Sequence, residues 1–280
     1  MTDAIQPINI SALMEKYHLK PKKDLGQNFL VDPDALQRIV EVADLDSDST
    51  VLEIGAGIGH LTRYLAASAR SVTAVELDEA LIPPLKEVLT DHDNVHIIQG
   101  DILNLNPADL VSVDRYMVVA NIPYYITSKI IRDMLESRHK PTRMVLTVQY
   151  EVAQRICAVA GDMSVLALSV QIYGEPYITS RIPASAFHPP PRVDSASIRV
   201  DLYPRPPLDA AERKLFFQLI KAGFQHKRKT IRNSIAAGLG WKKKRVEELL
   251  EKGEIDPQRR AETLSLPEWI ELTKVYGKIN

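Results

Sequence analysis

Short, mostly apolar runs alternate with one-faced amphipathic segments along the first two thirds of the sequence. Runs such as 50–54 and 116–120 have the length and composition of strands that are buried in a sheet. The segment 34–43 carries its apolar side chains at helical spacing, on one face. This alternation predicts an α/β fold. The strands that we expect are 50–54, 71–75, 95–98, 116–120, 144–148, 177–182 and 197–202.

The pattern changes after a proline-rich linker at 203–207, beyond which only helical periodicity is found. We therefore expect two domains, 1–204 and 205–280, the second small and all-helical. The helices expected in the first domain are 10–19, 34–43, 60–67 and 126–137, with a helical region over 150–173 that is interrupted near Gly161.

Charged residues are divided unevenly between these two parts. The formal net charge is −1, yet 1–204 carry 18 Lys and Arg against 26 Asp and Glu, whereas 205–280 carry 17 against 10. The stretch 224–233 is the most basic. This division favours a polyanionic partner for the C-terminal part, although a single basic run is more often a solvated helix face.

Length and composition limit the class of protein. The 280 residues, 45% hydrophobic and 25% charged, are typical of a globular chain with a large and a small domain. No apolar run approaches the ~20 residues that span a bilayer, and the N-terminus lacks the pattern of a secretory signal. The single cysteine, Cys157, excludes an internal disulfide and a cysteine-based metal cluster. We expect a cytoplasmic protein without a membrane anchor or a metal site.

A glycine-rich turn follows the expected strand 50–54 and precedes the helix 60–67. Glycines at the end of a strand allow a ligand to approach the backbone, as in nucleotide-binding turns. The dinucleotide fingerprint G-x-G-x-x-G is not met, because its third glycine would fall at His60. The pattern is instead E-x-G-x-G-x-G over 53–59. Alone, such a turn also fits a tight structural bend.

Acidic side chains stand at the ends of the next two expected strands. Glu76 follows 71–75 and lies 21 residues after Gly55, where an acid can accept hydrogen bonds from ribose hydroxyls. An exposed carboxylate near the start of the next helix is the alternative for Glu76. Asp101 closes the strand 95–98 and can accept from the amino group of an adenine. Because ligands of open α/β sheets bind at the carboxyl ends of strands, we expect these groups at one site.

The stretch Asn121-Ile122-Pro123-Tyr124 ends the strand 116–120 and is where we place the chemistry. Pro123 fixes its own φ and has no N–H, so it makes a rigid corner. This corner presents a side-chain amide, an unpaired backbone carbonyl and an aromatic ring. The exocyclic amine of a nucleobase requires this set, which offers acceptors for two N–H bonds and a ring for stacking.

A second aromatic residue, Phe187, heads the proline-rich stretch 187–195, which we expect to be a stiff, extended loop between two strands. Its ring is either the second wall of a base sandwich or an aromatic packed beneath the loop. The residues alone leave both open.

Taken together, these residues resemble the ribosomal RNA adenine dimethyltransferase family, and within it the small-subunit branch. The resemblance implies a Rossmann-like class I methyltransferase sheet with helices on both faces, followed by a small all-helical C-terminal domain. It also implies S-adenosyl-L-methionine as the methyl donor. The stretches that carry it, in this order, are 23–30, 53–59, 100–101, 121–124, 187–195 and 224–233.

The resemblance implies roles for single residues. Asn121 and the carbonyl of Ile122 or Pro123 would hold the N6 of a target adenine, and Tyr124 and Phe187 would stack on its base. The residues implied to bind the cofactor are Asn28, Leu30, Gly55, Glu76, Asp101 and Asn121. Those implied to contact RNA are Lys227, Arg228, Lys229 and Arg232. His226-Lys227 stands where many relatives carry Arg or other basic residues, so the patch stays basic but no base-specific role is assigned to it.

The implied substrate is a pair of adjacent adenines in the 3′-terminal hairpin loop of small-subunit ribosomal RNA. A partly assembled small ribosomal subunit would present this loop during ribosome biogenesis. The implied enzyme converts both adenines to dimethyladenosines and acts as a cytoplasmic monomer.

Other functions remain open from the sequence. A large-subunit ribosomal RNA adenine dimethyltransferase of the antibiotic-resistance type shares the glycine turn and 121–124, but 187–195 and 224–233 resemble the small-subunit branch. A DNA adenine methyltransferase usually has two prolines before its aromatic residue, and here Ile122 takes the first place. A binding protein that mainly checks ribosome assembly is a third alternative. A nucleotide-binding fold with another small ligand is a fourth.

Overall fold

The computed structural model describes residues 5–226 and 228–279, and the chain divides into two compact units. One unit comprises 1–153 and 176–202, and the other comprises 154–175 and 203–280. The division after residue 202 lies close to the expected boundary at 204.

The segment 154–175 differs from the expected division, because it belongs to the second unit. The backbone N–H groups of Gly161 and Met163 donate to the carbonyl oxygen of Glu262, at 3.0 and 3.1 Å. These bonds tie the segment to the C-terminal helices. Helical periodicity indicates that 150–173 is helical, but it carries no information about the core that the segment joins.

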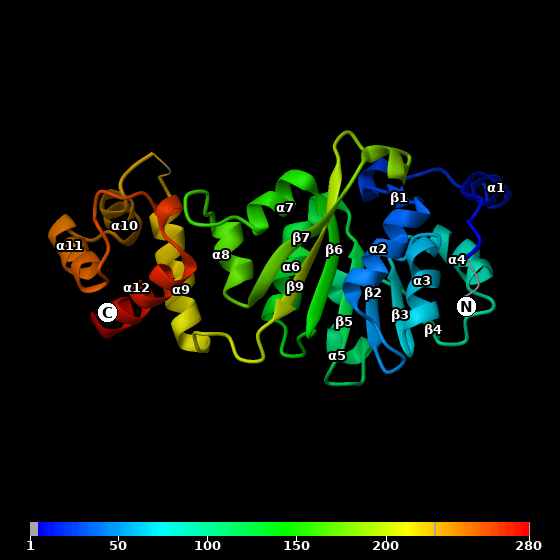
Figure 1. Ribbon diagram of the computed structural model, residues 1–280, viewed down its shortest axis with the longest axis horizontal. Coiled ribbons are helices and arrows are strands. Elements are labelled where there is room, and N and C mark those ends of the chain that lie inside the picture. The colour runs from blue at the N-terminus through cyan, green and yellow to red at the C-terminus, as the bar shows by residue number, and fades with distance from the viewer. Residues whose placement is uncertain (1–4, 227, 280) are drawn as a thin grey trace. The chain divides into compact units, whose positions relative to one another are not determined.

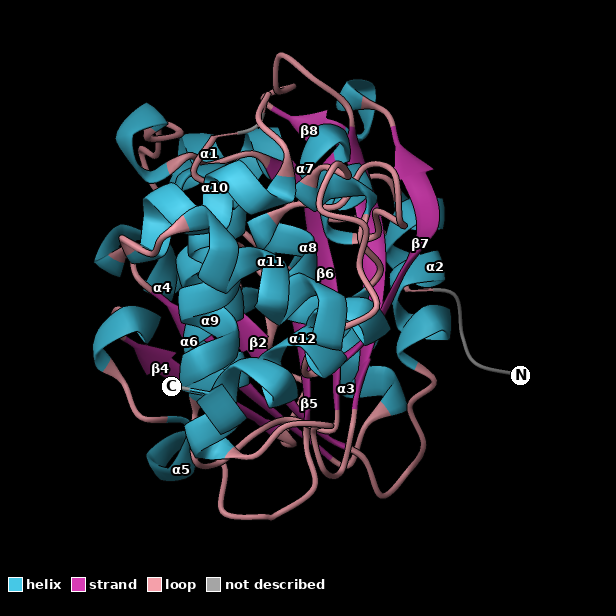
Figure 2. Cartoon of the chain, turned by 90° about the vertical axis from the view of Figure 1, so that its left-hand side faces the viewer, coloured by secondary structure: helices cyan, strands magenta, loops and turns pink. Residues whose placement is uncertain are grey.

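A seven-stranded sheet with the order β4-β3-β2-β5-β6-β9-β7 forms the first unit. Its first five strands are parallel, and β9 runs antiparallel to β6. Figure 2 shows β4, β2, β5 and β6 in this order, with β7 at the far edge. All the expected strands are confirmed, with shifts of at most three residues at their ends. The strands are β2 (Thr50–Ile54), β3 (Ser71–Glu76), β4 (Val95–Gln99), β5 (Met117–Asn121), β6 (Arg143–Gln149), β7 (Gly174–Ile182) and β9 (Ser195–Leu202).

Helices cover both faces of this sheet (Figure 1). The helix α3 (His60–Ser68) connects β2 to β3, and α6 (Thr127–Glu136) connects β5 to β6 in the opposite direction across the sheet. Because such crossovers are right-handed, the two helices lie on opposite faces. The other helices before residue 157 are α1 (Ile10–Lys16), α2 (Pro33–Ala43), α4 (Ile82–Val88), α5 (Pro107–Leu110) and α7 (Tyr150–Ile156).

The second unit is built from helices, as the periodicity predicts. Trp269, Phe216 and Tyr276 are buried in its core. The Asp209 side chain caps the first turn of the longest helix and forms a capping box with Glu212. The helices are α8 (Val165–Gln171), α9 (Ala210–Phe224), α10 (Ile231–Leu239), α11 (Lys243–Lys252) and α12 (Leu266–Ile279).

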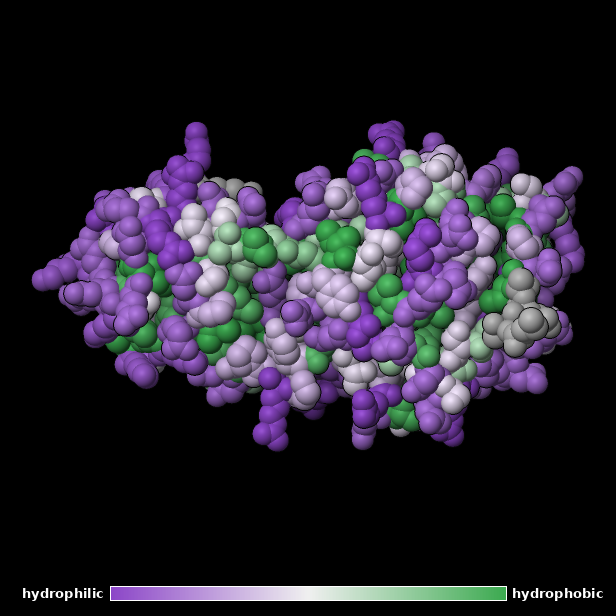
Figure 3. Space-filling model, viewed as in Figure 1, coloured by the Kyte–Doolittle hydropathy of each residue, from purple (hydrophilic) through white to green (hydrophobic). Residues whose placement is uncertain are grey.

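Hydrophilic residues predominate on the face of the molecule drawn in Figure 3, with smaller apolar areas between them. Among the described residues, no helix combines the length and the apolar character needed to cross a bilayer.

The carboxyl group of Glu53 on β2 is buried inside the first unit. Its side chain is 1% exposed, and its Oε2 has no hydrogen-bond partner among the described residues. Burial raises the pKa of Glu53 to about 8, the charge of Glu76 adds to this rise, and the nearby Thr62 hydroxyl only partly opposes it. Glu53 therefore keeps its proton at neutral pH.

Because the folded chain keeps a proton on Glu53 that the unfolded chain loses, we expect the first unit to become less stable as pH rises. The unfolded chain loses the proton near the ordinary pKa of 4.5, whereas the folded chain keeps it up to about pH 8. The contribution of Glu53 to the free energy of unfolding is thus complete below pH 4.5. It then falls by up to ~1.4 kcal/mol per pH unit until pH 8. Substituting Glu53→Gln should remove this part of the pH dependence in urea unfolding between pH 5 and 8.

Far-UV circular dichroism is the suitable signal, since both tryptophans of the chain, Trp241 and Trp269, lie in the second unit. The exposed Glu15→Gln is the matched control and should keep the wild-type pH dependence. Equal pH dependence in wild type and Glu53→Gln would contradict the buried, protonated carboxyl.

Candidate active site

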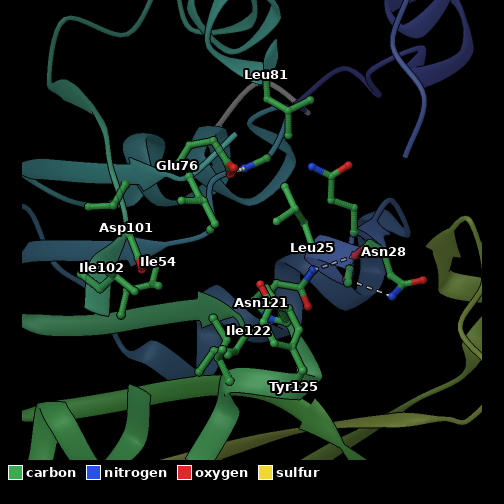
Figure 4. A pocket seen from close by; sticks show the side chains of 18 of the residues that line it. Leu25, Asn28, Ile54, Glu76, Leu81, Asp101, Ile102, Asn121, Ile122 and Tyr125 are labelled. Atoms are coloured by element: carbon green, nitrogen blue, oxygen red, sulfur yellow. Dashed lines mark hydrogen bonds between the residues drawn. The ribbon is translucent and has the colours of Figure 1, made fainter. Parts of the chain in front are cut away.

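A cavity of about 790 Å³, its open mouth included, lies at the carboxyl ends of the parallel strands (Figure 4). Gly55, Glu76, Asp101 and Asn121, which stand at the ends of β2, β3, β4 and β5, all line it. From β2 the chain continues to β3, its neighbour on one side, and from β5 it continues to β6, its neighbour on the other side, so the direction of the connections reverses between β2 and β5. Ligands of doubly wound sheets bind at such a switch point. The structure thus brings together four of the expected site residues.

The glycine turn allows the backbone to approach this cavity closely. Gly55 has φ +78°, and a Cβ on it would lie 3.5 Å from the carbonyl oxygen of Asn121. Gly57 has φ +60°, and a Cβ there would lie 3.0 Å from the ring of Phe29. A side chain at either position would be strained, and at Gly57 it would also crowd the ring of Phe29, which lines the cavity. The spacing of glycines noted in the sequence therefore has a conformational cause.

Glu76 holds the turns that follow β2 and β3. Its Oε2 accepts a hydrogen bond from the Gly57 N–H at 2.7 Å, and its Oε1 accepts one from the Asp78 N–H at 2.8 Å. The side chain is 7% exposed, so the alternative of an exposed surface carboxylate is wrong. Burial raises the pKa of Glu76, and the two N–H donors oppose this rise. Each oxygen has a further lone pair that can accept from a ligand hydroxyl.

Asp101 lines the cavity directly after β4 and caps a short turn there. Its Oδ1 accepts from the Leu103 N–H at 3.0 Å, and its Oδ2 accepts from the Asn104 side chain at 3.1 Å. These bonds fix the direction of the carboxylate. They leave acceptor capacity for a donor in the cavity, such as an amino group.

Asn121 is the last residue of β5, and its amide is oriented by a residue far away in the sequence. Its Nδ2 donates to the carbonyl oxygen of Asn28 at 3.1 Å, and the Asn28 side chain donates in turn to the Gly26 carbonyl at 3.1 Å (Figure 4). With Nδ2 engaged, the Oδ1 of Asn121 is left as an acceptor. Asn28, implied by the resemblance alone, thus reaches the cavity.

The structure of the turn after Asn121 shows which of two backbone carbonyls, that of Ile122 or that of Pro123, is free to accept a hydrogen bond from a ligand. The Pro123 carbonyl accepts from the Ile126 N–H at 3.2 Å and from the Thr127 hydroxyl at 3.3 Å. Within the described residues, no hydrogen bond reaches the Ile122 carbonyl. The free acceptor beside Asn121 is therefore that of Ile122. Tyr124 lines the cavity, and its hydroxyl lies 2.7 Å from the hydroxyl of the buried Ser195.

Two expected site residues have side chains outside the cavity. Leu30 in β1 (Phe29–Leu30) pairs with Phe187 in β8 (Phe187–His188), and each is 3% exposed in the hydrophobic core. Phe29 lines the cavity, but Leu30 and Phe187 do not. Of the two interpretations of Phe187, the structure shows packing beneath the loop.

The segment 22–28 contains residues that the sequence analysis missed. Lys22 and Gln27 both bind the Asp78 carboxylate, at 2.7 and 2.8 Å. Burial of Asp78 raises its pKa, but these two hydrogen bonds, a third from the Ala80 N–H and the charge of Lys22 together lower it overall. Asp78 thus holds the segment against the end of β3, beside the cavity. The segment has no periodicity or spacing that could have indicated this role.

The expected RNA-binding residues lie in the second unit, and they differ from one another. Arg228 and Lys229 are exposed in the turn before α10. Arg232 is half-buried and forms an ion pair with Glu247 of α11 at 2.7 Å. Lys227 lies outside the described residues. The charge pattern of the sequence could not distinguish the exposed Arg228 and Lys229 from Arg232, which forms an ion pair.

Comparison with known proteins agrees with this geometry. The sequence model of the family described as ribosomal RNA adenine dimethylase matches residues 18–278. A protein of Dehalococcoides mccartyi (strain CBDB1) named ribosomal RNA small subunit methyltransferase A is 45% identical over 266 residues, 95% of this chain and 91% of that one. A protein of the same name from Alkaliphilus metalliredigens is 40% identical and covers 98% of both chains.

Solved structures with the same fold include a dimethyladenosine transferase from Plasmodium falciparum. It has a TM-score of 0.78 and 25% identity, and the match covers 89% of this chain and 98% of that one. The 23S rRNA methyltransferase ErmE has a TM-score of 0.74 and 29% identity, with 89% and 99% covered. The expected α/β methyltransferase fold is confirmed by these neighbours. The chain belongs to the ribosomal RNA adenine dimethylase family.

Proposed function

We propose that this chain transfers methyl groups from S-adenosyl-L-methionine to the N6 of two adjacent adenines in the 3′-terminal hairpin loop of small-subunit ribosomal RNA. The observation that carries the proposal is the pair of acceptors at the end of β5, the Asn121 Oδ1 and the Ile122 carbonyl, beside a cavity lined by Glu76 and Asp101. The names of the relatives at 40–45% identity favour the small subunit.

The cavity suits the proposed cofactor. Glu76 has lone pairs for ribose hydroxyls, Asp101 can accept from an adenine amino group, and the turn at Gly55 gives the methionine part access to the backbone. When bound, the sulfonium supplies an electrophilic methyl group. Leu30 would support this site from behind, through its backbone or by packing, because its side chain is buried.

The acceptors at Asn121 and Ile122 address a chemical difficulty. The N6 lone pair of adenine is delocalised into the ring and attacks poorly. If both N6 hydrogens are held by these acceptors, the nitrogen is favoured in a pyramidal, more nucleophilic form, in line with the methyl group. Such positioning of two reactants removes about 7–11 kcal/mol from a barrier. No general base is required, because the nitrogen becomes acidic as it gains the methyl and then loses its proton to water.

The target base must leave the helical stack, or be unpaired already, to reach this site. Tyr124 is the wall on which it would stack, and the hydrogen bond to Ser195 holds the phenol in place. A stacking role for Phe187 requires its ring to turn out of the core.

The second unit would contribute contacts to RNA phosphates through Arg228 and Lys229, which are exposed. All the groups proposed for the site come from one chain, so we expect a monomer to act. A ribosomal substrate implies a cytoplasmic site of action.

The experiment that tests the proposed function follows labelled methyl transfer to small subunits from a strain lacking the modification, intact large subunits and naked large-subunit RNA. We expect dimethyladenosine at two adjacent positions near the 3′ end of small-subunit RNA. Label on large-subunit RNA alone would assign the activity of the ErmE-like neighbour instead. Tight subunit binding without label would favour an assembly factor.

Substituting Asn121→Ala should lower kcat by about 100-fold or more, the usual loss when one preorganised hydrogen-bonding group is removed from a reacting centre. Cofactor Kd, measured by calorimetry, should rise only a few-fold, because Glu76 and Asp101 are unchanged. Asn106→Ala, at an exposed asparagine that caps α5, is the control and should keep full activity. Wild-type turnover in Asn121→Ala would remove this residue from the mechanism.

The double substitution Arg228→Ala with Lys229→Ala should weaken RNA binding and flatten its salt dependence. Each phosphate contact contributes about 0.7–0.9 to the slope of log K against log salt, so the slope should fall by roughly 1.5. An unchanged salt slope in the double variant would exclude these two phosphate contacts.

Arg232→Ala should instead lower the stability of the second unit by ~1 kcal/mol, since it breaks the ion pair with Glu247. Tryptophan fluorescence during urea unfolding measures this loss.

A further inference from the structure

The aromatic side chains around the candidate site differ in how much ring surface they offer. Phe187 is 3% exposed and packs in the core, and Tyr124 is half-buried with its hydroxyl bound to Ser195. Tyr125 lines the same cavity but is 58% exposed. Its hydroxyl makes no hydrogen bond to any described residue. Of these three rings, that of Tyr125 is the most available to a ligand that arrives from solvent.

The ring of Tyr125 lines the cavity and lies against Gly26 of the segment 22–28. A Cβ at Gly26 would lie 3.3 Å from Cδ1 and 3.4 Å from Cε1 of this ring, so the glycine lies in contact with it. Gly26 has φ +61°, a backbone conformation that glycine adopts without strain. Figure 4 shows Tyr125 on the Asn121 side of the cavity. A single exposed tyrosine is ordinary, but one supported in this way at a cavity mouth offers a binding surface.

We propose that Tyr125 stacks on the nucleobase next to the target adenine; this inference rests on the proposed function. The target itself must reach Asn121 and Ile122, where Tyr124 forms the wall. Tyr125 is the next residue on the same short turn, Tyr124–Ile126, and its ring stands nearer to solvent. The base that follows or precedes the target along the RNA therefore meets Tyr125. Stacking on an aromatic ring tolerates any base and strengthens with the size of the base.

This assignment gives the enzyme a means to treat two adjacent adenines as a pair. When one adenine is in the site, the other is its neighbour and supplies a large purine face. Tyr125 would thus set a preference for a purine beside the target.

The test combines the substitutions Tyr125→Ala and Tyr125→Phe with two substrates, unmodified small subunits with adenine or with uridine beside the target. With the adenine neighbour, Tyr125→Ala should lower kcat/KM by about 10-fold, the scale of one lost base–aromatic stack, while Tyr125→Phe stays within about 2-fold. With the uridine neighbour, the loss for Tyr125→Ala should shrink to about 3-fold or less. Tyr177→Ala, at another exposed tyrosine of the first unit, is the matched control and should be unaffected on both substrates.

A purely structural role predicts different results. If Tyr125 only supports Gly26, Tyr125→Ala weakens cofactor binding in calorimetry without RNA and lowers activity equally on both substrates. That outcome, or activity of Tyr125→Ala equal to wild type on both, would overturn the inference. Absence of methyl transfer by the wild-type chain to any ribosomal RNA would instead overturn the proposed function.

Discussion

The structure of the candidate site depends on the two hydrogen bonds that the Glu76 carboxylate accepts from the backbone. The register of β2 with β3 and with β5 brings the carboxyl ends of these strands to one edge of the sheet. Register alone does not fix the turns that follow. The N–H groups of Gly57 and Asp78 converge on Glu76 and fix both turns. Asp78 is thereby placed to bind Lys22 and Gln27, so the N-terminal segment is held through the same carboxylate.

The N-terminal segment determines which atom of the Asn121 amide is left for the proposed reaction. Asparagine has a donor and an acceptor at nearly the same distance from the backbone, and either could face a ligand. In this chain the Asn28 carbonyl binds the donor, so the acceptor of Asn121 is the group left for the exocyclic amine. The Pro123 carbonyl is similarly occupied within its own turn, which leaves the Ile122 carbonyl as the second acceptor. Two neighbouring acceptors select an amine and disfavour a carbonyl.

Much of this arrangement could be predicted from the sequence, because it depends on local patterns. The apolar runs located every strand of the sheet, and the glycine spacing, Glu76, Asp101 and Asn121 follow from the rule that ligands bind at strand ends. The contact between Asn28 and Asn121 joins residues 93 positions apart and has no local signal. Burial of Phe187 depends on pairing between β1 and β8, strands of two residues each, which no periodicity reveals. The membership of 154–175 in the second unit likewise depends on tertiary hydrogen bonds.

Two of the buried carboxyl groups of the first unit, those of Glu53 and Glu76, have different surroundings beneath the cavity. Glu53 and Glu76 stand on adjacent strands, and like charges in a buried place disfavour each other's ionisation. Two backbone N–H groups stabilise the charged form of Glu76, whereas the Glu53 Oε2 has no partner among the described residues. The backbone donors therefore oppose the rise in the pKa of Glu76, which lines the cavity, whereas little opposes the rise at Glu53, which does not line it. The protonated Glu53 therefore adds no unpaired buried charge beside Glu76, which lines the proposed cofactor site.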